Sequence, residues 1–386
     1  MQTNQAVSVP GFTDHHAHLL RQAALAGRSA NFGSPVTAAG SAPPSADVRA
    51  FHQSVAATGR TPMDVLDPAP DLQRPGLDER LHGALGTAAA AGLVEVTEMG
   101  LRSWTYLDAL QSLQEAGPLP CRVRIYLASG LTQEASLAEL DARRADCGPW
   151  LQLDGVKFYA DGWLVPRTCA LCDEYADTAS RGLLFTSAED LARRISPLAE
   201  RGWRIATHAI GDRAVQVVLE AYELAFAGDR AAMAAAAPRI EHASVLSAEL
   251  IARLAADGVV ACIQPSFALS DASQLGPALG RDRAGLAYPW ASLAAAGVAM
   301  LAGTDYPIEI LEPLPSLARL AGGRSKRPGF ATGWSAPPQA RLPVAAAFAL
   351  MSDAGAGQTL LTADPRTASL AELDEIEVLG TRPAEF

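Results

Sequence analysis

Apolar and polar residues alternate along this chain in two repeating patterns. Short apolar runs rich in β-branched residues recur throughout, and most are followed by stretches whose apolar positions lie three or four residues apart. The first pattern is typical of buried strands and the second of amphipathic helices. The predicted strands, the first of them near Val9, cover residues 8–16, 93–99, 122–128, 153–160, 204–209, 239–243, 259–265 and 298–305.

The helical stretches carry recognisable start signals. Ser187 precedes Asp190 by three residues, which is the spacing of a capping box, and Leu191 and Ile195 follow at helical spacing. We therefore expect a helix to begin at Ser187. A second helix is predicted by an apolar stripe made of Ala214, Val217, Val218, Ala221, Tyr222 and Ala225.

Eight strands alternating with helices predict an α/β fold of the (β/α)8 type, a TIM barrel, because parallel neighbouring strands need crossover connections. A doubly wound open sheet is the alternative, but no glycine-rich phosphate loop follows an early strand. We expect one barrel domain over residues 1–365 and a short C-terminal tail over 366–386. Residues 21–71 are rich in Ala, Gly, Ser and Pro and show little periodicity, so we expect a lid or binding loop there.

The composition of the chain excludes some classes of binding partner. The net charge of −11 argues against nucleic acid and anionic membranes, and no apolar stretch reaches the roughly 18 residues that cross a bilayer. The first residues resemble no signal peptide, and five cysteines, an odd number, do not indicate a disulfide framework. We expect a cytoplasmic protein with a small-molecule substrate, and leave a homodimer open.

The segment "GFTDHHAHLL" places three of the seven histidines within four positions. In extended backbone His16 and His18 share a face with Asp14, whereas His15 points the other way. Imidazole is the commonest metal ligand, but this segment alone does not distinguish a metal site from a polar loop.

Other predicted strands supply partners for these histidines. His208, His242 and Asp305 stand at strand ends, and Lys157 lies within a strand. Taken singly, each has a structural explanation: a hydrogen-bonded core histidine, a turn aspartate or a lysine that extends to solvent. Taken together they converge, because the carboxyl ends of barrel strands meet at one mouth.

The same residues lie in five motifs that resemble a known family. "PGFTDHHAH", "GVKFYADG", "THAIGDRAV", "RIEHAS" and "LAGTDYP" occur between about Pro10 and Pro313 in the order and spacing of the amidohydrolase superfamily. They look most like the branch of amidohydrolase family 3 that contains N-substituted formamide deformylases. Relatives usually carry an accessory β-sandwich, which we expect to be largely absent here.

The resemblance implies two divalent metal ions held by six side chains: His16, His18, Lys157, His208, His242 and Asp305. The first two histidines and the aspartate would hold one metal, and the other two histidines would hold the second. The lysine, carboxylated by carbon dioxide, would bridge them, because an unmodified ammonium offers no acceptor. Zn²⁺ is the expected metal, with Mn²⁺, Fe²⁺ and Co²⁺ as alternatives.

This metal pair implies hydrolysis of a C–N bond in an amide or formamide. A hydroxide shared by the metals would attack the carbonyl, and Asp305 would act as the catalytic proton carrier to the leaving nitrogen. An aminohydrolase that deaminates a ring, or a lactonase or esterase, remains open on the same site. A catalytically silent barrel that serves as a binding module is the alternative from another class.

Further residues near strand ends are candidates for substrate contacts: Arg102, Trp104, Trp163, Arg167, Gln264 and Phe267. Cys169 and Cys172 form a single C-x-x-C, which does not indicate a zinc ribbon. Asp212 is expected in the first turn of a helix, where the dipole favours an acid. His52 and His82 lie outside the predicted strands and are expected in solvent.

Overall fold

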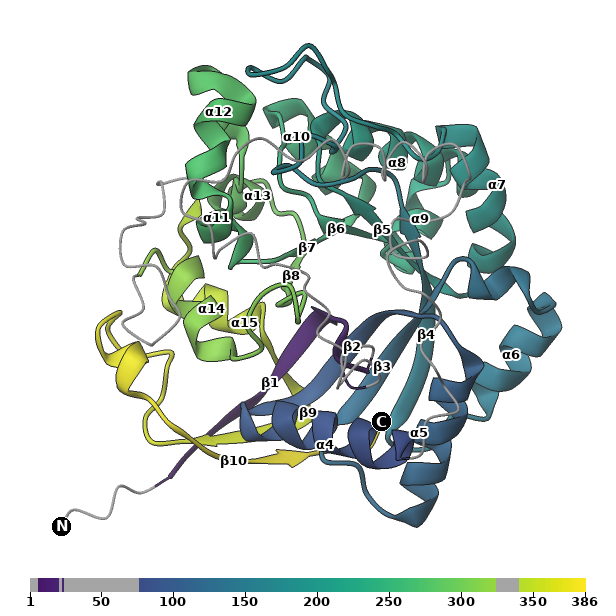
Figure 1. The fold of residues 1–386 in the computed structure, drawn as a ribbon, viewed down its shortest axis with the longest axis vertical. Helices are drawn as coiled ribbons and strands as arrows, with labels where there is room; N and C mark the ends of the chain where they lie inside the picture. Colours follow the sequence, from purple (N-terminus) through teal and green to yellow (C-terminus); the bar gives the residue numbers. More distant parts are fainter. Residues whose placement is uncertain (1–5, 21–22, 24–75, 324–339) are drawn as a thin grey trace.

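The structure, a computed structural model, describes residues 6–20, 23, 76–323 and 340–386 of the chain. Eight strands pair in parallel, each with the next along the chain, in a sheet that curves around a central axis (Figure 1). Every predicted strand has its counterpart, and the predicted α/β fold is confirmed. The strands are β1 (Val7–Ala17), β2 (Leu93–Leu101), β3 (Arg122–Ala128), β4 (Leu151–Tyr159), β5 (Arg204–Ala209), β6 (Arg239–His242), β7 (Val260–Ile263) and β8 (Met300–Ala302).

Helices form a ring outside these strands (Figure 1). They are α4 (Leu77–Ala90), α5 (Trp104–Ala116), α6 (Leu137–Ala145), α7 (Ala188–Ala199), α8 (Asp212–Ala225), α9 (Arg230–Ala236), α10 (Ala248–Asp257), α11 (Phe267–Ser270), α12 (Ala272–Arg283), α13 (Trp290–Ala295), α14 (Pro313–Leu320) and α15 (Val344–Ala349). The Ser187 side chain accepts a hydrogen bond from the Asp190 N–H at 3.1 Å, so α7 begins as predicted. On α8, most of the predicted stripe is buried, but Val217 and Ala225 are only half-buried.

The barrel closes between β1 and the segment that follows β8. The Asp305 N–H donates to the His16 carbonyl at 2.6 Å, and the His18 N–H donates to the Tyr306 carbonyl at 2.7 Å. Gly303 permits this approach, since a Cβ atom there would lie 2.4 Å from the His16 nitrogen. We call residues 303–306 and their β1 partners the closure seam. The seam brings side chains from the two ends of the barrel sequence to one place.

Two antiparallel strands extend the sheet beyond β1. They are β9 (Ser352–Leu361), which pairs with β1, and β10 (Val378–Pro383), which pairs with β9. The expected tail, residues 366–386, therefore contains a sheet strand as well as the short turn of helix Glu372–Glu375. In the described part of the chain, β9 and β10 are the antiparallel addition to the eight parallel strands.

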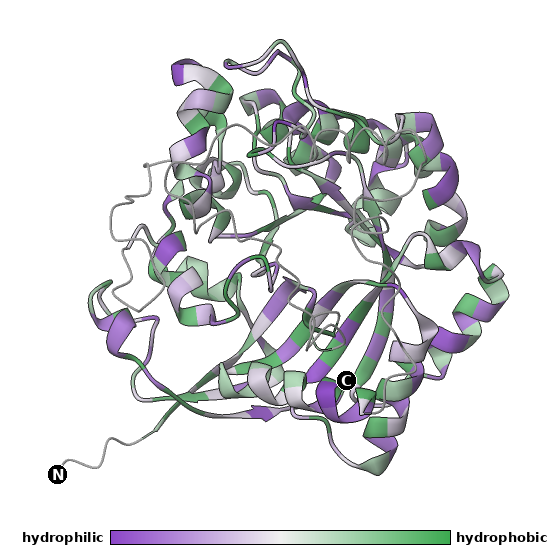
Figure 2. Cartoon of the chain, viewed as in Figure 1, coloured by the Kyte–Doolittle hydropathy of each residue, from purple (hydrophilic) through white to green (hydrophobic). Residues whose placement is uncertain are grey.

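The apolar core lies mainly between strands and helices, whereas the barrel interior contains many polar groups. A small separate cluster of Met99, Tyr126 and Ala206 lies apart from the main core. Buried ion pairs join Glu95 to Arg122 and Arg239 to Glu241. Figure 2 shows hydrophilic residues interspersed along the strands around the centre.

Two expectations lie outside the described residues. Apart from Ala23, the predicted lid or binding loop over residues 21–71 is not among them, and neither is His52. Within the described ranges, none of the helices has the length and apolar character needed to cross a membrane.

Candidate metal centre

A cavity opens among the carboxyl ends of the barrel strands. Strands β1, β4, β5 and β6 and the loops that follow β4 and β8 contribute its walls. All six side chains predicted as metal ligands lie in its lining, together with the substrate-contact candidate Trp163 and four residues that the sequence did not single out. The lining consists of His16, His18, Lys157, Tyr159, Asp161, Gly162, Trp163, His208, His242, Asp305 and Ile308.

Asp305 lies between His16 on β1 and His18, which directly follows that strand. Its Oδ1 is 3.5 Å from Nε2 of His16 and 3.2 Å from Nε2 of His18. Donor atoms of His16, His242 and Asp305 all lie within 4.8 Å of one another. Side chains from the first strand, the sixth strand and the closure seam therefore meet closely enough to share one ion.

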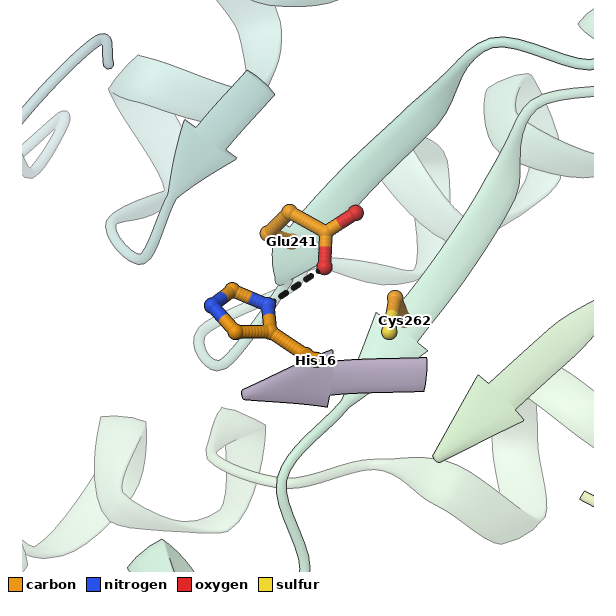
Figure 3. A group of neighbouring side chains, drawn as sticks. All are labelled: His16, Glu241 and Cys262. Atoms are coloured by element: carbon orange, nitrogen blue, oxygen red, sulfur yellow. Dashed lines mark hydrogen bonds and ion pairs between the residues drawn. The ribbon is translucent and has the colours of Figure 1, made fainter. Parts of the chain in front are cut away.

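His16 is held by a buried carboxylate. Its Nδ1 lies 2.6 Å from Oε2 of Glu241 (Figure 3). Arg239 pairs with both oxygens of that carboxylate at 2.8 and 3.1 Å. Because a carboxylate accepts, the proton sits on Nδ1 and the lone pair of Nε2 faces Asp305. A metal-binding histidine usually has such a carboxylate partner on its other nitrogen.

Sequence reasoning missed Glu241, although it lies in the quoted motif "RIEHAS" directly before His242. Alternation along a strand would put neighbouring residues on opposite faces. His242 has a φ of 75°, which breaks that alternation and lets both side chains reach the site.

Cys262 lies beside this pair on β7 (Figure 3). Donor atoms of His16, Glu241 and Cys262 lie within 4.8 Å of one another, which is compatible with a metal. Burial, however, raises the pKa of the Cys262 thiol well above its ordinary value. The Glu241 oxygens are also already engaged by Arg239 and His16. We therefore infer that Glu241 and Cys262 do not bind a metal themselves and that they pack against His16 and hold its ring in place.

His208 and His242 form the opposite wall, with ring centroids 4.4 Å apart. Nε2 of His208 lies 3.0 Å from the Gly162 carbonyl, and Nδ1 of His242 has no hydrogen-bond partner among the described residues. His242 and Asp305 adopt φ values of 75° and 58°, which are unfavourable for residues other than glycine. Such strained backbone tends to occur at functional sites.

Lys157 is fully buried in the barrel wall. Its Nζ makes no hydrogen bond within the described part of the chain. Burial lowers the pKa of its amine to about 8. A buried cation without a hydrogen-bond partner is unfavourable, so this position suits a neutral amine or a modified one better than an ammonium.

The protonation states favour metal binding. Burial lowers the pKa values of His16 and His242 well below the ordinary range, which keeps the imidazoles neutral. Burial acts to raise the pKa of Asp305, but nearby His16, His18 and Lys157 hold it below its ordinary value. Neutral imidazole and ionised carboxylate are the forms that bind metals. The residues present therefore fit a divalent metal centre.

The substrate-contact candidates divide into two groups. Trp163 lines the cavity, and the ring of Phe267 lies 5.9 Å from that of His242. The Gln264 amide nitrogen lies 3.4 Å from His16 Nδ1 and 3.1 Å from the carbonyl of Cys262. Gln264 therefore packs against His16 on the side of Glu241.

The remaining candidates are engaged elsewhere. Arg167 is buried and pairs with Asp177 at 2.7 Å. The Trp104 ring, at the start of α5, packs beneath the Arg143 guanidinium at 4.4 Å. Arg102 is half-buried just after β2 and is not among the described lining residues.

The structure also places the cysteine pair, Asp212 and His82. Cys169 and Cys172 are free thiols, and the first contacts the Tyr175 hydroxyl at 2.9 Å. Asp212 is the first residue of α8, and His82 is exposed on α4.

Comparison with known proteins supports a family assignment. The sequence profile of the amidohydrolase family matches residues 57–364. The chain is 29% identical over 255 residues to the protein YtcJ of Bacillus subtilis (strain 168), and 32% identical over 200 residues to the protein LONG AFTER FAR-RED 3 of Arabidopsis thaliana. These matches cover 65% and 50% of this chain, but only 46% and 34% of the two relatives.

Solved structures share the fold. A metal-dependent hydrolase of Pyrococcus furiosus superposes with a TM-score of 0.68 at 22% identity, covering 97% of this chain and 85% of that one. Atrazine chlorohydrolase TrzN of Arthrobacter aurescens TC1, solved with zinc, gives a TM-score of 0.56 at 14% identity, covering 98% and 81%. At these identities the likeness concerns the fold. Through the matched profile, which spans most of its length, the chain belongs to the amidohydrolase family.

Proposed function

We propose that this protein is a metal-dependent hydrolase that cleaves the C–N bond of an amide or formamide with two divalent metals. The observation that carries the proposal is the convergence of six potential ligands on one cavity. Family membership and the neutral state of the buried imidazoles support it.

The proposed ligands divide between two positions. His16, His18 and Asp305 would hold one metal, and His208 and His242 the other. Zinc suits this set of nitrogen and oxygen donors. When bound, two such metals would polarise a carbonyl oxygen and lower the pKa of a water toward neutrality.

Asp305 is the proposed proton carrier. Its carboxylate lies in the cavity lining, and the surrounding histidines favour its ionised form. An ionised Oδ1 accepts the proton of the attacking water and then donates it to the leaving nitrogen, which departs as a neutral amine.

Lys157 is proposed to be carboxylated. Its neutral amine forms an N–C bond with carbon dioxide and releases one proton, which gives a carbamate with two acceptor oxygens. The lowered pKa of about 8 makes the neutral amine available. The change would give this buried position an anionic group whose two oxygens could hold metals, in place of an amine that offers no anionic ligand.

The test pairs elemental analysis with a substrate panel. Protein produced with excess zinc or manganese is analysed for metal, then assayed against formamides, amides, lactones and aminopurines. We expect two metal equivalents per chain and turnover of a formamide or amide. Turnover of only aminopurines or lactones would replace the substrate assignment, and metal-free protein with no turnover would favour a binding module.

A further inference from the structure

Asp161 is a fully buried carboxylate just after β4. It accepts backbone hydrogen bonds from Ala170 at 2.9 Å, Ile210 at 3.0 Å and Gly211 at 2.9 Å. Ala170 belongs to the loop after β4, whereas the other two lead from β5 into α8. The carboxylate therefore joins two loops at the cavity mouth and has little freedom to rotate.

The same carboxylate faces His208. Its Oδ1 lies 3.3 Å from His208 Nε2, and the carbonyl of Gly162 lies 3.0 Å from that nitrogen. A carbonyl oxygen only accepts, so the hydrogen bond to Gly162 requires a proton on Nε2. In a neutral imidazole, Nδ1 then keeps the lone pair.

We propose that Asp161 is a positioning residue that holds His208 in the tautomer protonated at Nε2, so that Nδ1 is the atom available to a metal. The negative charge beside Nε2 favours the proton there, and the three backbone N–H groups keep the carboxylate in place. His16 has the opposite tautomer, since Glu241 holds its proton on Nδ1. The two walls of the cavity would thus present different imidazole nitrogens.

The metal-binding part of this inference rests on the proposed function, but the tautomer does not. The first test is therefore made on metal-free wild-type protein labelled with ¹⁵N-histidine, at about pH 8, above the ordinary imidazole pKa. Two-bond ¹H–¹⁵N correlation spectra identify which ring nitrogen is protonated, and a His208→Ala variant assigns the signal. We expect the Nε2–H tautomer. The Nδ1–H tautomer would overturn the proposal, whatever the fate of any Asp161 variant.

The second test uses Asp161→Asn. The amide best satisfies two of the three backbone N–H groups by placing its oxygen at the Oδ2 position, where Ala170 and Gly211 donate. Its NH₂ then faces His208 Nε2, where a second donor is unfavourable. We expect a population of the Nδ1–H tautomer in this variant, and zinc affinity reduced by about 10–100-fold, the loss typical when an outer partner of a ligand is removed.

Asp257→Asn is the matched control. Asp257 is an equally buried carboxylate, but it pairs with Arg230 and Arg253 on the outer helices. We expect it to lower stability without changing the His208 tautomer or zinc affinity. Unchanged tautomer and affinity in Asp161→Asn, or equal affinity losses in both variants, would overturn the role of Asp161. A wild-type Nε2–H tautomer in a protein that binds no metal would instead count against the proposed function.

Discussion

His16 and Glu241 are joined across the barrel interior by a 2.6 Å contact between Nδ1 and Oε2. One residue begins the barrel and the other lies in its sixth strand, 225 positions later. Both side chains are almost completely buried, and Arg239 holds the carboxylate from the other side. This contact fixes which nitrogen of His16 faces the cavity and gives the candidate centre a rigid base.

Glu241→Gln should weaken metal binding. The amide lacks the charge that holds the Nδ1 proton and pairs with Arg239, so His16 would lose its fixed orientation. We expect about a 10–100-fold loss of zinc affinity, measured by competition with a chromophoric chelator. Glu95→Gln is the control, because Glu95 is also buried and paired with an arginine, Arg122. Comparable losses of affinity in both variants would contradict the account.

Gly303→Ala tests the closure seam. The added Cβ would lie 2.4 Å from the His16 nitrogen, so β1 and the segment after β8 would have to separate. We expect lower thermal stability together with loss of bound metal. Gly276→Ala, with nothing within 4 Å of its Cβ, should change neither. Full metal content in the Gly303 variant would show that the seam does not position the ligands.

Lys157→Ala should lose metal and activity, because the proposed bridge disappears. A short carboxylate such as acetate can enter the vacated space and supply two oxygens. We therefore expect partial recovery of both properties when acetate is added, measured by metal content and turnover on the same sample. Two tightly held metals in the variant without acetate would refute the bridging role.

Because Asp271 is buried, we expect the free energy of unfolding to depend on pH. Burial raises the pKa of its carboxyl to about 7, against the hydrogen bond from the Tyr288 hydroxyl at 2.5 Å. A raised pKa means that the folded protein holds this proton after the unfolded chain has lost it, so wild-type stability falls between about pH 4 and 7. Relative to Asp271→Asn, we expect wild type to lose roughly 1–2 kcal/mol between about pH 5 and 8, allowing for partial exposure. Denaturant unfolding at both pH values measures this, and a constant difference would contradict it.

The sequence predicted the site best where a residue of a metal-binding type stood at the end of a predicted barrel strand. Strands and helices alternate clearly, and chemistry-bearing residues at strand ends must meet when the strands are parallel. For this reason His208, His242 and Asp305 could be expected in one cavity before any coordinates were known, and the structure places them there.

Other features depend on contacts that spacing does not reveal. Glu241 was missed because the φ of His242 breaks strand alternation. Asp161 was not singled out from the sequence, since its backbone partners come from segments 9 to 50 residues away. Arg167 and Trp104 follow strands as expected, but Asp177 and Arg143 hold them elsewhere.

The most direct test of the central claim measures metal content and hydrolysis in the same preparations of wild type, His208→Ala and His82→Ala. His208 lines the cavity, whereas His82 is exposed on α4. We expect two metal equivalents and full turnover in wild type, turnover within a few-fold of this in the His82 variant, and loss of both in the His208 variant. An active wild-type preparation without tightly held metal, or equal losses in the two variants, would contradict it.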